Sequence, residues 1–233
     1  PLTIENNHIE IFSRYEWDDN SGAIYVENGN NWNASTLIKN NTIEIYNGVN
    51  VGIYARNNTD IIDNTISFGD RYAWQCGMSQ YGDYLRAIDV DDSDHHIIRG
   101  NTITNFAKGI EMSNSTDNIV DSNYIHTLSD YIMQGGWQTQ NWSNYNYGIY
   151  ANNSDSLFIT NNTIKTGSGT LIYQTNGAST IKYNLLETSS GRGIYCENQA
   201  GVEFSNNTIV STSGSGDYGV HVSNLSAPII KNN

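Results

Sequence analysis

The sequence has 233 residues and a formal net charge of −13 at pH 7, with 15% charged and 37% hydrophobic residues. We expect residues 1–233 to form a single domain, excerpted from a longer protein because both ends lie inside a repeat. The negative charge and the lack of a basic run argue against nucleic acid and anionic membranes as partners. No apolar run is long enough to insert into a membrane.

An N-x-I motif recurs from one end of the chain to the other, and several of its intervals are 22 or 23 residues, such as 101 to 123 and 184 to 207. The motif begins at Asn7, Asn41, Asn64, Asn101, Asn123, Asn162 and Asn207, and Asn184 of N-L-L and the final Asn233 mark the equivalent position in their repeats. The segments G-I-Y-x-x-N and I-x-x-N-x-I alternate apolar and polar residues, which is the period of strands. A fixed period of short strands predicts an all-β parallel solenoid of about eight to nine rungs, each of about 22 residues.

The N-N-T-I and G-I-Y-x-x-N motifs resemble those of the right-handed parallel β-helix family, which includes pectin-degrading enzymes, alginate epimerases and phage tailspikes. The resemblance covers essentially the whole chain and implies a right-handed parallel β-helix. Asparagine suits the corners of such a fold, because it tolerates a left-handed backbone and its amides form ladders between rungs. The Asn-rich repeats are also similar to archaeal surface β-helix proteins such as methanogen disaggregatases, which cut a chondroitin-like matrix polymer.

The G-I-Y strands present alternate residues outward, on one shared face. The predicted outward pairs are Tyr25/Glu27, Tyr54/Arg56, Asp89/Asp91, Glu111/Ser113, Tyr150/Asn152, Tyr195/Glu197 and His221/Ser223. Three long inserts, at 8–22, 67–86 and 126–147, fall between N-x-I and the next G-I-Y. We therefore expect three loops at one corner, beside this face.

The repeat copy at 86–103 is the most acidic, and its outward positions carry Asp89 and Asp91. Adjacent strands lie about 4.8 Å apart and alternate residues about 6.6 Å apart, so Asp89, Asp91 and Glu111 should form a cluster. These separations bracket the two carboxylate geometries of glycoside hydrolysis. One of three such close carboxylates should hold its proton towards neutral pH. We predict these three residues to be catalytic, as acid, base or nucleophile.

Aromatic and basic residues around this cluster are predicted to bind a polysaccharide, because sugar rings stack on Trp and Tyr and because arginine recognises acidic groups. The predicted substrate contacts are Tyr54, Arg56, Arg71, Trp74, Tyr84, Arg86, His96, Trp137, Trp142 and Tyr150. The same aromatic residues could instead pack the loops into small cores over the solenoid.

Other interpretations of the cluster remain open. Asp89, Asp91 and Glu111 could bind Ca²⁺, although no cofactor is required by the hydrolase hypothesis. A lyase would use Tyr54, Tyr150 or His96 as base or acid. A non-catalytic carbohydrate-binding adhesin or tailspike-like module would use the aromatic residues alone, and the acids would then be solvated surface.

Several residues near the cluster have structural interpretations. Asp92 should occupy the corner-Asn position and Asp94 should cap a turn. His95 and His96 lack the spacing of a zinc site. Cys76 and Cys196 lie about four rungs apart, which is too far for a disulfide. The sequence as a whole predicts a secreted or cell-surface enzyme that degrades an acidic or amino-sugar-containing polysaccharide, and it carries no signal for the oligomeric state.

Overall fold

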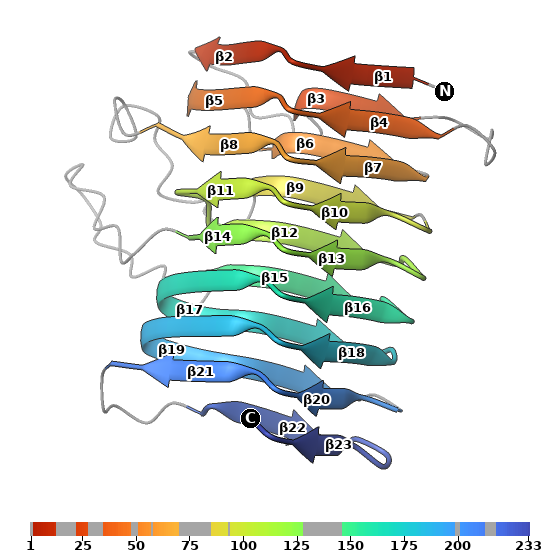
Figure 1. Cartoon of the computed structure of the whole chain (residues 1–233), viewed down its shortest axis with the longest axis vertical. Helices are drawn as coiled ribbons and strands as arrows, with labels where there is room; N and C mark the ends of the chain where they lie inside the picture. Colours follow the sequence, from red (N-terminus) through yellow and green to blue (C-terminus); the bar gives the residue numbers. More distant parts are fainter. Residues whose placement is uncertain are drawn as a thin grey trace, which may run out of the picture.

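The computed structural model describes residues 2–12, 22–27, 35–47, 51–56, 58–69, 85–92, 94–127, 146–198, 201–212 and 218–233. Within these ranges the chain forms 23 strands, and no helix is long and apolar enough to cross a membrane. The strands stack in rungs from β1 to β23, with the chain winding once per rung (Figure 1).

The first strand of each rung belongs to a nine-stranded parallel sheet. Its members, in order, are β1 (Leu2–Glu5), β4 (Thr36–Lys39), β7 (Thr59–Ile62), β10 (Ile97–Arg99), β13 (Ile119–Asp121), β16 (Leu157–Thr160), β18 (Ser179–Lys182), β20 (Glu203–Ser205) and β23 (Ile229–Lys231).

The second strand of each rung follows after a corner. This set comprises β2 (His8–Phe12), β5 (Thr42–Asn47), β8 (Thr65–Phe68), β11 (Thr102–Thr104), β14 (Tyr124–His126) and β21 (Thr208–Ser211). The third set comprises β3 (Gly22–Glu27), β6 (Val51–Arg56), β9 (Arg86–Asp91), β12 (Lys108–Ser113), β15 (Tyr147–Asn152) and β22 (Val220–Ser223). Two long strands, β17 (Thr163–Thr175) and β19 (Leu185–Glu197), run through both sets without a break.

Isoleucine fills the interior of the third set. Ile53, Ile88, Ile110 and Ile149 pair in register from rung to rung and are fully buried. Burying each such side chain stabilises the fold by about 2 kcal/mol. The inward column therefore fixes the register, and the register decides which side chains meet on the outward face.

Asparagine marks the corner between the first and second strands, as the sequence predicts. Several corners carry two asparagines in succession, as at 40–41 and 161–162. The first of the two has a left-handed backbone, with Asn40 at φ 55° and Asn161 at φ 56°. The second is buried, and its side-chain amide donates to the Oδ1 of the next one, as from Asn64 to Asn101 at 3.0 Å. The ladder continues through all nine of these repeat asparagines, from Asn7 to Asn233.

The three expected inserts all connect a second strand to a third strand. They join β2 to β3, β8 to β9 and β14 to β15, so their ends lie at the same corner of the solenoid. The predicted boundaries of the first insert are wrong, because His8–Phe12 forms β2. These residues pair with β5 and continue the second sheet, so the insert itself begins after Phe12.

Candidate functional site

The outward face of the third strands carries a column of aromatic side chains that two acids interrupt. Strand register orders the column as Tyr25, Tyr54, Asp89, Glu111, Tyr150, Tyr173, Tyr195 and His221. The prediction that residues about 22 apart share one wall is confirmed. The copy at 169–175, which aligns ambiguously by sequence, supplies Tyr173.

Asp89 and Glu111 lie directly opposite each other on β9 and β12. Two cations hold them. Arg86 Nη1 is 2.8 Å from Asp89 Oδ2, and Arg86 Nε contacts Glu111 Oε2. Lys108 Nζ lies 3.1 Å from Glu111 Oε1 and 3.0 Å from its Oε2. Both oxygens of Glu111 are thus occupied, whereas Oδ1 of Asp89 makes no hydrogen bond to another described side chain.

The backbone explains why Lys108 reaches Glu111, which lies three residues further along the chain. Gly109 follows Lys108, and a Cβ added there would point into the core, 2.6 Å from the carbonyl oxygen of Gly148. Gly109 and Ile110 therefore both face inward, and Lys108 returns to the outward side beside Glu111. Strand alternation alone would have put Lys108 and Glu111 on opposite faces.

Asp89 and Glu111 are the two buried carboxylates of the described residues, at 5% and 7% exposed. Burial, opposed by Arg86 and assisted by the nearby Glu111, raises the pKa of Asp89 from 3.8 to about 6. The expectation that one carboxyl of the cluster keeps its proton towards neutral pH thus matches Asp89. Among the described residues, the charged groups that shift this pKa most are Arg86 and Asp91 on β9 and Glu111 on β12.

Asp91 lies two residues further along β9 and faces outward like Asp89. Its Oδ2 is 3.4 Å from Arg56 Nη2, and its side chain is 29% exposed. Arg56 also holds Glu27, with Nη1 2.9 Å from Oε1. Asp91 is therefore anchored on one side and open to solvent on the other.

The aromatic rings on either side of the acids stack on one another. Tyr150 and Tyr173 have centroids 5.1 Å apart and planes 2° apart, and Tyr195 and His221 continue the stack. Lys108 Nζ lies 4.6 Å from the centroid of Tyr150 and covers the ring at the end next to the acids. Because neighbouring rings cover each other's faces, the column presents mainly ring edges and hydroxyls to a ligand.

Tyr54 lies on the other side of the acids, opposite Asp89 on β6. Its ring stacks on Tyr25 at 4.8 Å between centroids. Burial raises the pKa of Tyr54 to about 12, and the Asp91 and Asp89 carboxylates act in the same direction against the opposing effect of Arg56. Tyr54 therefore stays protonated at neutral pH, which makes it poorly suited to act as a general base.

His96 lies elsewhere than predicted. It is fully buried, with Nδ1 3.1 Å from the carbonyl oxygen of Thr59, and its backbone N–H donates to Asn118 Oδ1 at 2.8 Å. Burial lowers the pKa of His96 to about 4. The assignment of His96 as a substrate contact or catalytic acid or base is therefore corrected to a core residue, because its ring has no access to the outward face.

The remaining predicted contacts divide into two groups. Tyr54, Arg56, Arg86 and Tyr150 gather around the acids, and Arg86 belongs to β9 rather than to the preceding insert. Another five lie outside the described residues, namely Arg71, Trp74, Tyr84, Trp137 and Trp142.

Ca²⁺ fits this donor set poorly. The ion requires six to eight oxygen ligands, but Arg86 and Lys108 already engage the oxygens of Asp89 and Glu111. Across the part of the chain that the structure describes, no three His, Cys, Asp or Glu side chains come together as a metal site.

The two predicted structural acids behave as expected. Asp92 has a left-handed backbone at φ 48°, and its Oδ1 accepts from Asn114 Nδ2 at 3.1 Å. Asp94 Oδ1 accepts from the backbone N–H and the hydroxyl of Thr116. Both therefore maintain the corner between β9 and β10.

Sequence reasoning missed Lys108. The signal was present, because R-A-I-D at 86–89 and K-G-I-E at 108–111 carry a cation three residues before the acid in adjacent rungs. The same position holds Tyr147 and Arg192 in later rungs, on the same outward face.

Comparison with a family model agrees with this architecture. The family model described as right handed beta helix region matches residues 81–233. The structure is similar to an alginate lyase from Paenibacillus sp. str. FPU-7, with 11% identity, a TM-score of 0.40 and coverage of 99% of this chain and 91% of that one. It is also similar to the catalytic domain of a GH87 alpha-1,3-glucanase in complex with nigerose, with 13% identity, a TM-score of 0.29 and coverage of 84% and 51%.

Among curated proteins, no sequence matches this chain. The family match extends over most of the residues, and every strand pair of the described structure is parallel. The chain belongs to the right-handed β-helix family.

Proposed function

We propose that this protein hydrolyses a polysaccharide bound along the outward face of β6, β9, β12 and β15. The observation that carries the proposal is the opposition of Asp89 and Glu111 in the middle of an otherwise aromatic column. Burying two acids and two cations carries a desolvation penalty that their ion pairs need not repay, so a functional role explains the cluster better than stability does. Pairs of carboxyl groups with different environments are the machinery of glycoside hydrolysis.

Asp89 is the general acid in this proposal. Its pKa of about 6 keeps a proton on the carboxyl group under mildly acidic conditions. Arg86 binds Oδ2, so Oδ1 carries the proton and donates it to the oxygen of the departing sugar. Arg86 then stabilises the carboxylate that forms.

Asp91 is the general base. It faces the same side of β9 two residues away, about 6.6 Å along the strand, and part of its side chain is open to water. This backbone spacing is comparable to the lower end of the 6.5–9.5 Å that separates the two carboxyl groups of inverting enzymes, between which a water molecule fits. Cleavage with inversion of the anomeric centre follows from this pairing.

Glu111 acts through Asp89 and is a positioning residue. Its two oxygens are bound by Arg86 and Lys108, which leaves it poorly suited to attack a sugar. Its negative charge raises the pKa of Asp89. Glu111 thereby tunes the acid that protonates the substrate.

The substrate class of the proposal is an acidic or amino-sugar-containing polysaccharide. The tyrosine edges on both sides of the acids offer hydroxyls and apolar ring rims, which suit the mixed surface of a sugar chain. Polymers of this kind occur outside the cell, so the proposal includes a secreted or cell-surface location. The aromatic column would serve a non-catalytic binding module equally well, and this is the second candidate function.

A panel of polysaccharides separates the candidates. The protein is incubated with uronate-containing and neutral polymers, and both reducing ends and the ultraviolet absorbance of unsaturated uronates are followed. Hydrolysis predicts new reducing ends without that absorbance. Reducing ends that appear with the absorbance would identify a lyase instead. Binding to a polymer without any cleavage, across pH 4 to 8, would identify a binding module.

A further inference from the structure

The cations of the candidate site are almost all engaged by the protein's own acids. Arg56 pairs with Glu27 and Asp91, and Arg86 pairs with Asp89 and Glu111. Lys108 pairs with Glu111 as well. None of the three is therefore available to a negatively charged ligand without giving up an internal ion pair.

Arg192 differs from these three cations. It occupies the same position in its rung as Arg86 and Lys108, because register connects Lys108 to Tyr147, Tyr147 to Thr170 and Thr170 to Arg192. Its side chain is exposed, and no carboxylate of the described residues forms an ion pair with it.

The Tyr195 ring contacts the Arg192 guanidinium on the outward face. Its central carbon lies 5.4 Å from the centroid of Tyr195, within the range of a cation–π contact. The acids of the same strand have other partners, because Glu197 accepts a hydrogen bond from the Tyr195 hydroxyl at 2.8 Å and Glu187 pairs with Lys165. The guanidinium is thus positioned beside the ring edges that would contact a sugar chain, and within the described residues no carboxylate neutralises its charge.

We infer that Arg192 forms an anion-recognising subsite that binds a carboxylate or sulfate group of the polysaccharide. This inference rests on the proposed function, because the subsite lies on the same aromatic column. Three rungs separate Glu111 from Tyr195, or about 14 Å along the solenoid axis. Arg192 therefore binds a sugar unit several positions from the cleaved bond, and this contact favours charged over neutral chains. A planar guanidinium suits either anion, since both accept paired hydrogen bonds.

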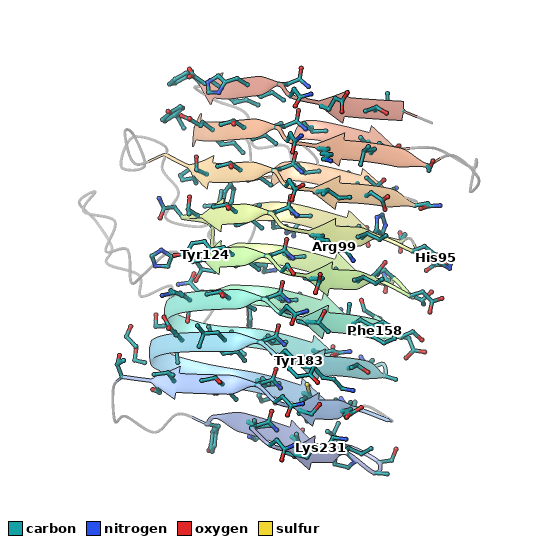
Figure 2. The ribbon with its side chains drawn as sticks, viewed as in Figure 1. His95, Arg99, Tyr124, Phe158, Tyr183 and Lys231 are labelled. Carbon is teal, nitrogen blue, oxygen red and sulfur yellow. The ribbon has the colours of Figure 1, made fainter. Side chains whose placement is uncertain are left out.

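The test measures binding to two polymer pairs that differ in charge. Polygalacturonate is compared with its carboxyl-reduced form, and dextran sulfate with dextran, by calorimetry at low salt. The D89N variant is used throughout so that cleavage does not consume the ligand. R192Q and R192K are made in that background, and R99Q serves as the matched control. Arg99 lies on β10, on the other sheet, where Figure 2 labels it, and it pairs with Asp121.

We expect D89N to bind one anionic polymer at least tenfold more tightly than its neutral partner. R192Q should lose about tenfold in affinity for that polymer and nothing for the neutral one, whereas R192K should retain part of the preference. R99Q should behave like the parent, which excludes an effect of net charge alone. Preference for polygalacturonate identifies a carboxylate as the recognised group, and preference for dextran sulfate identifies a sulfate.

Two results would overturn the inference and leave the proposed function standing. They are cleavage by the wild type without any preference for charge, and a charge preference that survives in R192Q. If no polymer is bound or cleaved, the inference and the proposed function fail together. Thermal melting of R192Q and R99Q verifies that each variant is folded during the comparison.

Discussion

Asp89 and Glu111 face each other across two parallel strands, and the guanidinium of Arg86 contacts both carboxylates. Glu111 raises the pKa of Asp89 through its charge, and Arg86 lowers it. The E111Q substitution keeps the shape of the side chain and removes the charge. We expect the pKa of Asp89 to fall from about 6 towards its ordinary value. Carbon NMR titration of the Asp89 carboxyl measures this shift, and an unchanged or higher pKa would contradict the role given to Glu111.

The same raised pKa makes stability depend on pH in a defined direction. Asp89 binds its proton more tightly in the folded state, so its contribution to stability is complete below about pH 4 and is lost as the pH rises through 6. The loss is on the order of 3 kcal/mol for a shift of this size. D89N has no such group. The difference in unfolding free energy between wild type and D89N should therefore fall between pH 4 and pH 6 and then level off. Denaturant titrations at several pH values test this, and a difference that stays constant or grows would show that Asp89 ionises normally.

His96 has the opposite effect. Its pKa is lowered to about 4 by burial, so the folded state binds the proton less tightly than the unfolded state. The stability contributed by neutral His96 is present above about pH 6.5 and is lost as the pH falls through 4, by about 3 kcal/mol. Asparagine occupies the equivalent position in the next rung, at Asn118. H96N should therefore fold and resist acid better than the wild type. Chemical denaturation at pH 4.5 and pH 7 measures the effect, with H95N, an exposed neighbour, as the control.

The buried asparagine ladder should contribute strongly to stability. Asn101 accepts from the backbone and side chain of Asn64 and donates to Asn123 and to the carbonyl of Ile61. N101A leaves several of these buried groups without partners, and we expect a loss of roughly 3 kcal/mol or more. T102A, at the exposed residue that follows, should change stability by about 0.5 kcal/mol or less. Urea unfolding compares the two variants, and similar losses would mean that the ladder is not a major source of stability.

The sequence predicts the fold well because the repeat determines it. The N-x-I period fixes the number of rungs, and inward Ile residues fix the register, so that Asp89 and Glu111 are correctly predicted to be neighbours. The repeat does not locate Tyr173 unambiguously, because β17 runs from Thr163 to Thr175 without the usual break between its two halves. The period carries no information about such local changes in the path of the chain.

The site is harder to predict than the fold, because side-chain contacts depend on departures from strict alternation. Lys108 reaches Glu111 only because Gly109 and Ile110 both face the core. The acidic run beside His96 suggests a substrate-binding or catalytic histidine, yet His96 occupies a buried corner position opposite Asn118. A pattern of residue types identifies neighbours along the stack, whereas packing decides which of them reach solvent.

The most direct test of the account compares cleavage by wild type, D89N and D121N on whichever polysaccharide the wild type degrades. Asp121 lies on β13 of the nine-stranded sheet, so D121N changes the charge equally and leaves the outward acids intact. The rate of reducing-end release gives the result. If Asp89 is the general acid, the cleavage rate of D89N should fall by about 100-fold or more while the variant still binds the polymer. D121N should keep nearly all of the wild-type rate. A D89N variant that cleaves as fast as D121N would contradict the assignment of the site.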